Sequence, residues 1–421
     1  MSTLVKEDLF ENLLESAPAN FTEARQTAKD LYLKSGLPAP KEEEYKFTGI
    51  TKKLEKSLSN FNQAKPLSVD ENLIKESVFQ GFEGDVLVFS NGKFLQEVSS
   101  TIEGLEVSDI LSSSAEIGSI AKAEKDAFAA LNQASFSGGI SIKVPKKTKV
   151  EKPILLLSFN GANDGQVITP RFWIEVGDFS EVTFLDQSIS MGEEAYFVNK
   201  VVEIKGGLNS HINYYRLQNE SNQAIEVSNI ETDIQSDARF TSVNISLSGD
   251  MVRNNLSLNL LGSNSEGNMY GIYLLNGKTH VDNHTNVDHT IPHAESNEMY
   301  KGIFDAQSRG VFNGKIFVRQ DAQKTNAFQQ NNNVLLSDDA IVNTKPQLEI
   351  WADDVKCSHG CTVGQLDEEA LFYLQARGIG KVQAKGLLLY AFAGEVMEKI
   401  EEESFKNHVV GLIQDRLGSK F

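Results

Sequence analysis

The chain has 421 residues, of which 40% are hydrophobic and 9% aromatic, so it can bury a full core over two or three structural regions and is not a disordered protein. Its formal charge of -18 argues against nucleic acid or an anionic membrane as a partner, because phosphate binding draws on clustered Lys and Arg. Two cysteines cannot form a disulfide framework, and no apolar run resembles a membrane span or a signal peptide; together these features predict a cytoplasmic protein.

Residues 1–80 are predicted to form an N-terminal helical region. Apolar side chains recur at helical spacing up to about residue 60, at Leu9, Phe10, Leu13, Leu14, Ala28, Leu31 and Tyr32. The segment KEEEYKF continues this pattern after a break at Gly36. Pro38 and Pro40 separate two helical pieces, because proline pushes the preceding residue out of the helical region.

Residues 81–149 have a mixed α/β pattern and lead into the core. DVLVFSNGKFLQEV predicts two short strands around a turn at Asn91 and Gly92. An alanine-rich helix is expected to follow, from about Ala115 to Leu131.

Residues 150–362 consist of short β-branched and apolar runs separated by Gly, Ser, Asn and Asp. A small turn cluster followed by a strand start begins at Asp178, Gly207, Ser236, Ser263, Gly277, Ala306 and Ser337. These positions differ by 29, 29, 27, 14, 29 and 31 residues. A repeat of this length, once halved, is typical of a parallel solenoid with two main faces per coil. A Greek-key sandwich would give irregular spacing and more turn prolines.

The polar tract QQNNN, Gln329–Asn333, reads as low complexity when taken alone. Inside a solenoid, stacked coils let amide side chains hydrogen-bond in ladders, and we favour this interpretation.

Residues 363–421 are predicted to form a C-terminal helical region. The helix LDEEALFYLQARG has Asp367 as its candidate N-cap, acidic residues in its first turn, and Gly378 just beyond its end. Two further helices are expected at about 381–402 and 405–417. Their apolar surface exceeds what a lone hairpin needs, so one face should dock on the solenoid or on a partner.

Both cysteines lie in DDVKCSHGCTVGQ, residues 353–365. On a strand, Cys357, His359 and Cys361 share one face, and the two thiols lie about 13 Å apart at about 3.3 Å per residue. One tetrahedral zinc ion cannot bridge that gap. The stretch therefore offers an open, incomplete donor set, suited to transient metal or sulfur handling or to ligation completed by another chain. The structural alternative is two small buried residues beside a hydrogen-bonded histidine.

A second group of candidate ligands is HVDNHTNVDHTIPH, which contains His280, His284, His289 and His293. It is either a metal site or a set of histidines stacked on adjacent coils, and the second interpretation is favoured. No nucleophile elbow, Walker loop or dinucleotide fingerprint occurs. The acid pair Asp338 and Asp339 leaves open a β-helical polysaccharide lyase or hydrolase.

Several stretches resemble the SufB/SufD family of iron-sulfur cluster assembly proteins. They are LEIWADDVKCSHGCTVGQLDEEALFYLQARGI from Leu348, GVFNGKIFVRQDAQKTNAFQQNNNVLLS from Gly310, VDHTIPH from Val287 and PAPKEEEYKFT from Pro38. The Cys-Ser-His-Gly segment favours the SufD side of the family. Ala340 supports this, because a SufB protein would carry a cysteine in that stretch.

The resemblance implies a mainly β fold, with a right-handed parallel β-helix core flanked by N-terminal and C-terminal α-helical regions. It also implies a non-enzymatic scaffold subunit of a cytosolic SufBCD complex, which pairs with a SufB paralogue and binds a SufC ATPase. Such a subunit contributes to iron acquisition and cluster assembly. No tightly bound cofactor is expected, only transient iron or an iron-sulfur cluster in the complex, and the isolated chain is expected to form a homodimer.

The resemblance also assigns roles to individual residues. His359 corresponds to the proposed cluster ligand at the interface, and Cys357 to the thiol beside it. The helices between Asp367 and Val396 correspond to the SufC-docking surface, for which the named candidates are Asp367, Glu368, Leu371, Phe372, Tyr373 and Arg377. Two positions depart from the family pattern: Cys361 stands where alanine is usual, and Tyr45 where tryptophan is common. Cys361 is therefore a weak candidate ligand.

Overall fold

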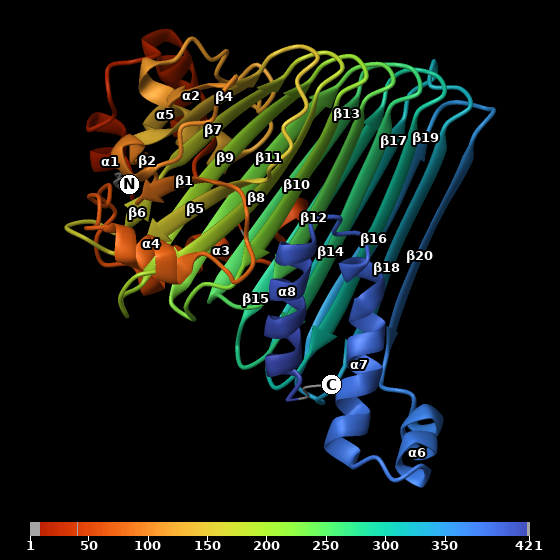
Figure 1. Cartoon of the computed structure of the whole chain (residues 1–421). Coiled ribbons are helices and arrows are strands. Elements are labelled where there is room, and N and C mark those ends of the chain that lie inside the picture. The colour runs from red at the N-terminus through yellow and green to blue at the C-terminus, as the bar shows by residue number, and fades with distance from the viewer. Residues whose placement is uncertain (1–8, 40, 419–421) are drawn as a thin grey trace, which may run out of the picture.

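The computed structural model describes residues 9–39 and 41–418 and consists mainly of two long sheets that face each other (Figure 1). Sheet B has the strand order β2 (Lys93–Phe94), β1 (Asp85–Ser90), β5 (Ile154–Asn160), β8 (Glu181–Ser190), β10 (His211–Gln218), β12 (Arg239–Ser246), β14 (Glu266–Leu275), β16 (Glu295–Phe304), β18 (Asn326–Leu335) and β20 (Lys356–Gly364). Sheet A has the order β19 (Ile341–Ile350), β17 (Arg309–Val318), β15 (His280–His289), β13 (Met251–Leu260), β11 (Ala224–Ile234), β9 (Tyr196–Gly206), β7 (Pro170–Val176), β4 (Gly138–Val144) and β3 (Glu106–Asp109), with β6 (Val167–Ile168) beside β9.

From β7 onward the chain alternates between the two sheets, so each strand pairs in parallel with the strand one coil away. This is the predicted parallel solenoid. The predicted spacing has a physical basis in the turns from sheet A to sheet B, six of which, from the β7–β8 turn to the β17–β18 turn, contain one residue with a left-handed backbone. These residues are Phe179, Asn209, Asp237, Asn264, His293 and Lys324. The single interval of 14 residues marks the step from this set of turns, at Ser263, to the turn from β14 to β15 on the opposite side, at Gly277.

The interior between the sheets is formed by every second residue of each strand. Most are apolar and belong to one continuous cluster that extends from Leu87 and Phe89 to Phe312 and Ile316. The interior also holds ion pairs, one of which joins Lys200 to both carboxylate oxygens of Asp186. The predicted amide tract lies at the far end of this interior, where Gln329, Asn331 and Asn333 are buried and Asn333 donates to Asn331 at 2.7 Å.

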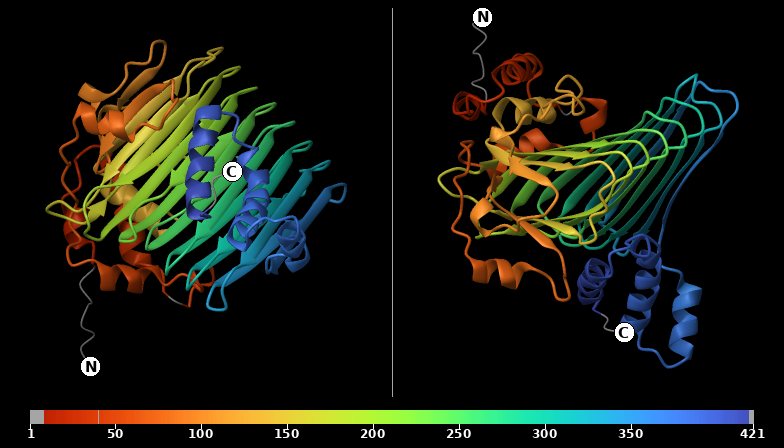
Figure 2. Two further views of the ribbon diagram at one scale, coloured as in Figure 1. Left: turned by 60° about the horizontal axis from the view of Figure 1, so that its bottom comes forward. Right: turned by 45° about the horizontal axis from the view of Figure 1, so that its top comes forward.

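The outer face of sheet A is covered by the N-terminal region (Figure 2). Its elements there are α1 (Glu11–Glu15), α2 (Thr22–Ser35), the 3₁₀ turn η1 (Glu43–Tyr45), α3 (Ile50–Ser57) and α5 (Ala127–Ser135). Helix α4 (Glu71–Ser77) instead packs with Ile74 on the outer face of sheet B. The segment KEEEYKF forms only that single 3₁₀ turn, not a longer helix. Tyr45 donates its hydroxyl to Asp126 at 2.5 Å, and the Arg253 guanidinium lies 3.9 Å from its ring. A tyrosine therefore makes a hydrogen bond at the position where tryptophan is common in the family.

The helix expected from Ala115 to Leu131 begins later than predicted. Asp126 caps α5 by accepting hydrogen bonds from the N–H groups of Phe128 and Ala129, which fixes the helix start. The preceding loop instead directs the N–H groups of Gly118, Ile120 and Ala121 to the buried carboxylate of Glu203. This carboxylate, more than 80 positions along the chain, replaces the helical hydrogen bonds.

The turn predicted at Asn91 and Gly92 is confirmed, since both residues have positive φ and join β1 to β2. Together with β3, the antiparallel β2 ends the sheets at the N-terminal side of the solenoid. Two short 3₁₀ turns, η2 (Gln96–Val98) and η3 (Ile110–Ser112), adjoin these strands.

The C-terminal helices are α6 (Glu368–Ala376), α7 (Lys381–Met397) and α8 (Glu403–Arg416). The predicted cap of α6 is confirmed, because Asp367 accepts from the N–H groups of Glu369 and Ala370, and Gly378 has φ +88° after the last turn. Helices α7 and α8 bury Leu389 and Phe405 against the outer face of sheet B, as expected from their excess apolar surface. Helix α6 projects beyond the sheet and contains no buried residue (Figure 1).

Candidate functional site

The C-terminal end of the solenoid is formed by the terminal strands β19 and β20. Strand β20 carries the Cys-Ser-His-Gly-Cys segment and is exposed along nearly its whole length. Cys357 packs against the interior cluster and pairs in register with the inward-facing Ala327 of β18. Strand alternation then places His359 and Cys361 on the same inward side, in register with Gln329 and Asn331. The three predicted donors thus line the open mouth of the solenoid.

The same residues also present the unpaired backbone of sheet B. Lys356 donates its N–H to Thr325 of the neighbouring segment. Because backbone groups alternate in direction along a strand, Cys357, His359, Cys361 and Val363 direct theirs away from β18. On β19 the corresponding row includes Pro346, whose missing N–H removes one edge donor. The β20 edge is therefore the more complete template for a further strand.

The donors remain separate in the chain alone. Cys357 and Cys361 are four residues apart on one extended strand, which corresponds to about 13 Å. Within residues 9–39 and 41–418, no three His, Cys, Asp or Glu side chains gather closely enough to hold a metal ion. Burial raises the pKa of the half-buried Cys357 thiol, against a smaller opposite effect of a hydrogen bond with the Ala327 backbone. The thiol is thus protonated at neutral pH until a cation approaches it.

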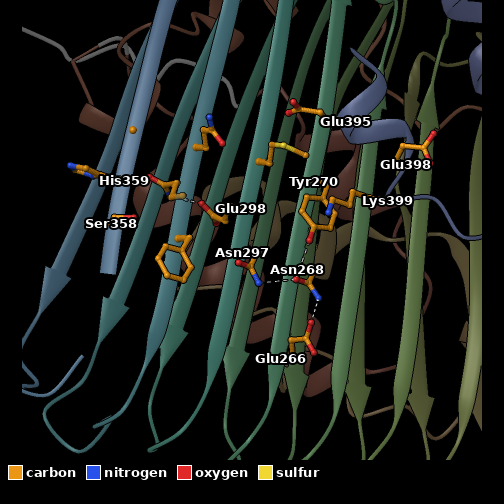
Figure 3. Close-up of a pocket in the computed structure, with 15 residues that line it drawn as sticks. Glu266, Asn268, Tyr270, Asn297, Glu298, Ser358, His359, Glu395, Glu398 and Lys399 are labelled. Atoms are coloured by element: carbon orange, nitrogen blue, oxygen red, sulfur yellow. Dashed lines mark hydrogen bonds between the residues drawn. The ribbon is translucent and has the colours of Figure 1, made fainter. Parts of the chain in front are cut away.

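A groove of about 920 Å³ runs beside this mouth. Its lining residues belong to β14, β16, β18 and β20 and to the end of α7 with its following turn. Ser358 and His359 stand at one side of the groove, and Glu395, Glu398 and Lys399 stand at the other (Figure 3). The candidate ligand His359 therefore borders both the open mouth and the groove.

The four clustered histidines do not converge on one point. His280 and His284 lie on the outer side of β15, where His280 is 3.0 Å from Thr48 and His284 is 3.0 Å from Asp282. His289 points inward and lies 2.8 Å from Ser296, and His293 occupies a left-handed turn. The favoured alternative, stacking on adjacent coils, is wrong in its geometry, because His280, His284 and His289 lie on the same strand, but these three side chains do lie within hydrogen-bonding distance of Thr48, Asp282 and Ser296.

The predicted partner-binding residues lie on α6. Asp367 caps the helix, Glu368 lies in its first turn, and Leu371 lines a small pocket against the turn after β18. Phe372 is 73% exposed and Tyr373 58% exposed, and Arg377 donates to the Tyr373 hydroxyl at 2.9 Å. The exposed aromatic pair is an apolar surface without a cover in the described chain.

The remaining predicted residues, Asp338 and Asp339, lie exposed in the turn between β18 and β19. Ala340, which follows them, is buried. None of the described helices combines the length and apolar character that crossing a membrane requires.

Sequence reasoning missed two buried polar residues behind His359, namely Glu298 of β16 and Gln329 of β18. Burial raises the pKa of Glu298 to about 7, although hydrogen bonds from Gln329 and Thr285 oppose this rise. The repeat itself contained the signal, since residues 298, 329 and 359 are separated by intervals of 31 and 30. Stacking the sequence at that period would have aligned them.

The fold and this site define a class: a parallel β-solenoid with helical covers and an open end that presents soft ligands beside unpaired backbone. Comparison with protein families agrees along almost the whole chain. Residues 159–392 match the family described as SUF system FeS cluster assembly, SufBD core domain, and residues 7–156 match the SufBD protein N-terminal region. The chain belongs to the SufBD family of iron-sulfur cluster assembly proteins.

Curated relatives agree with this assignment. The chain is 29% identical over 398 residues to the iron-sulfur cluster assembly protein SufD of Escherichia coli, covering 94% of this chain and 92% of that protein. It is 29% identical over 405 residues to an iron-sulfur cluster assembly SufBD family protein of Synechocystis sp., covering 91% and 88%. It is 31% identical over 300 residues to Protein ABCI7, chloroplastic, of Arabidopsis thaliana, covering 68% and 63%.

Proposed function

We propose that this chain is a SufD-type, non-enzymatic subunit of a cytoplasmic assembly complex, pairing with a SufB-like paralogue and binding a SufC-like ATPase. The observation that carries the proposal is the uncovered strand β20, on which His359 and Cys357 stand beside free backbone groups. A second chain that adds a strand there would bury the edge and bring its own ligands to these donors.

The chemistry of the donors fits a transient cargo. Imidazole and thiol are soft ligands that suit iron and iron-sulfur clusters. His359 and Cys357 alone do not complete a coordination shell, so iron or a nascent cluster is held only while the complex is assembled. Cys361 lies further along the same inward row and is the weaker candidate.

The exposed aromatic pair Phe372 and Tyr373 on α6 supports the ATPase contact. Large exposed apolar side chains beside polar ones are typical of protein interfaces. Helix α7, which follows α6, is packed directly on sheet B and so connects the proposed ATPase contact to the solenoid.

The test is iron loading of the complex. His359→Ala, co-expressed with the SufB-like and SufC-like chains and reconstituted anaerobically with Fe²⁺ and sulfide, is expected to retain at least tenfold less iron than the wild type. Ser358→Ala is the matched control, because Ser358 lies beside His359 on the opposite face of the strand. A His359→Ala complex that loads iron like the control would refute the proposed ligand.

A further inference from the structure

Three neighbouring strands of sheet B carry polar side chains at one inward position. Glu298 of β16 pairs in register with Gln329 of β18, and Gln329 pairs with His359 of β20. In Figure 3, Glu298 accepts a hydrogen bond from the strand that lies between it and His359, and the donor is Gln329. Adjacent strands lie about 4.8 Å apart, so Gln329 bridges the space between an interior acid and the exposed histidine.

Gln329 has one defined orientation. It is 3% exposed, and its Nε2 donates to Oε2 of Glu298, which also accepts from the Thr285 hydroxyl at 3.3 Å. The Gln329 amide nitrogen thus faces Glu298, and the amide oxygen points away from it. Gly314 leaves room for this arrangement, since a Cβ there would lie 2.3 Å from Gln329 Nε2.

The amide oxygen is the part of Gln329 that needs a partner. Gln329 Oε1 is buried and accepts no hydrogen bond from any described residue. A buried acceptor without a donor costs about 1–3 kcal/mol, and the inward side chain in register with it on β20 is His359. The structure shows no hydrogen bond between the two side chains, but a ring N–H of His359 turned toward Gln329 would supply the donor that the row lacks.

We propose that Gln329, held by Glu298, is a positioning residue that fixes the tautomer of His359 and leaves its other ring nitrogen free for iron at the open mouth. The proposal rests on the ligand role of His359 proposed above. Hydrogen bonds behind a histidine ligand fix the ring and its tautomer in this way, and their loss typically costs 10–100-fold in metal affinity.

The first test measures the tautomer without any metal. In the full chain labelled with ¹⁵N-histidine, the His359 signal is identified as the one that disappears in His359→Ala. At a pH where the ring is neutral, the wild type should show one tautomer, and Gln329→Leu should show a mixture. Gln330→Leu is the matched control, because Gln330 is the next residue on β18 and faces outward. An unchanged His359 signal in Gln329→Leu would overturn the proposal.

A second variant keeps the test independent of how well Gln329→Leu folds. Gly314→Ala leaves every polar group in place but inserts a methyl group against Gln329. It should displace the amide and produce the same tautomer mixture, with an unchanged circular dichroism spectrum. A wild-type tautomer in a folded Gly314→Ala chain, with Gln329 shifted, would also count against the proposal.

Iron binding then separates the two proposals. Gln329→Leu should raise the dissociation constant of the complex for Fe²⁺ by 10–100-fold, and Gln330→Leu should leave it unchanged. If His359→Ala loads iron normally, His359 is not a ligand and the proposed function fails. The tautomer measurement still decides whether Gln329 orients His359. If His359→Ala loses iron but Gln329→Leu keeps the wild-type iron affinity and the wild-type tautomer, His359 remains a ligand and only the positioning role of Gln329 is rejected.

Discussion

The charge of individual buried groups determines how this chain responds to pH. Cys357 keeps its proton because burial disfavours the thiolate, so the site is not a strong ligand set before iron or a partner arrives. A protonated thiol binds metal with release of a proton. Loading of the site should therefore be weaker in acid than at neutral pH.

Glu231 gives a quantitative pH prediction at the residue scale. Burial raises its pKa from 4.5 to about 7, with smaller opposing effects of Lys125 and Ser257. Because the folded pKa is the higher one, the protonated side chain contributes stability below pH 4.5, and this contribution is lost as pH rises through about 7. The free energy of unfolding of Glu231→Gln, relative to that of the wild type, should therefore rise by up to about 3 kcal/mol between pH 4.5 and pH 8.

Denaturant unfolding at pH 5 and pH 8 measures this difference. Asp237→Asn, in an exposed turn of the next segment, is the control and should show no comparable change between the two pH values. Equal effects of Glu231→Gln at both pH values would contradict the prediction.

At the scale of elements, the loop before α5 depends on one distant carboxylate. Glu203 accepts from three loop N–H groups and forms an ion pair with Arg171 at 2.6 Å, with both side chains fully buried. Glu203→Ala leaves a buried guanidinium without its charge partner, which typically costs 3–5 kcal/mol. The amides of Ile120 and Ala121 should then exchange with deuterium far faster.

Hydrogen exchange read by mass spectrometry over residues 115–125 checks this prediction. Glu116→Ala is the control, because Glu116 lies exposed on the same loop and its carboxylate is 3.7 Å from the Lys205 ammonium group. Retained protection of the loop in Glu203→Ala would mean that its order comes from other contacts.

Helix α6 gives a second element-scale prediction. Phe372→Glu combined with Tyr373→Glu should abolish capture of the SufC-like ATPase, because the pair is exposed and would no longer offer an apolar surface. Thermal unfolding should be nearly unchanged, since α6 buries no residue against the solenoid. Val382→Glu, on the neighbouring helix and 71% exposed, tests whether the surface extends to α7. Full ATPase binding by the double variant would place the contact elsewhere.

At the scale of the whole molecule, the isolated chain is expected to pair through its open end. Val363→Pro should reduce the dimer fraction measured by light scattering, because it removes an edge N–H without breaking the ladder to β18. Thr101→Pro, in a loop near the opposite end, is the control. An unchanged dimer in Val363→Pro would assign the contact to another surface.

The solenoid was predictable because its turns repeat in the sequence, from the cluster at Asp178 to the one at Ser337. The face shared by Cys357, His359 and Cys361 followed from strand alternation alone. The predicted helix start at Ala115 was wrong because N–H groups of the segment before residue 127 donate to the carboxylate of Glu203, which is distant in sequence. Gln329 was read only as part of an amide tract, since its relation to His359 depends on the register between strands.

The two ends of the solenoid differ, and this difference limits the stoichiometry of end-to-end association. Short antiparallel strands terminate both sheets at one end, whereas full-length parallel strands terminate them at the other. A solenoid with open strand edges at both ends would assemble into fibres, whereas a solenoid with open edges at one end can bind only one partner there. Such a chain can form pairs, with its own kind or with a paralogue, and growth stops there.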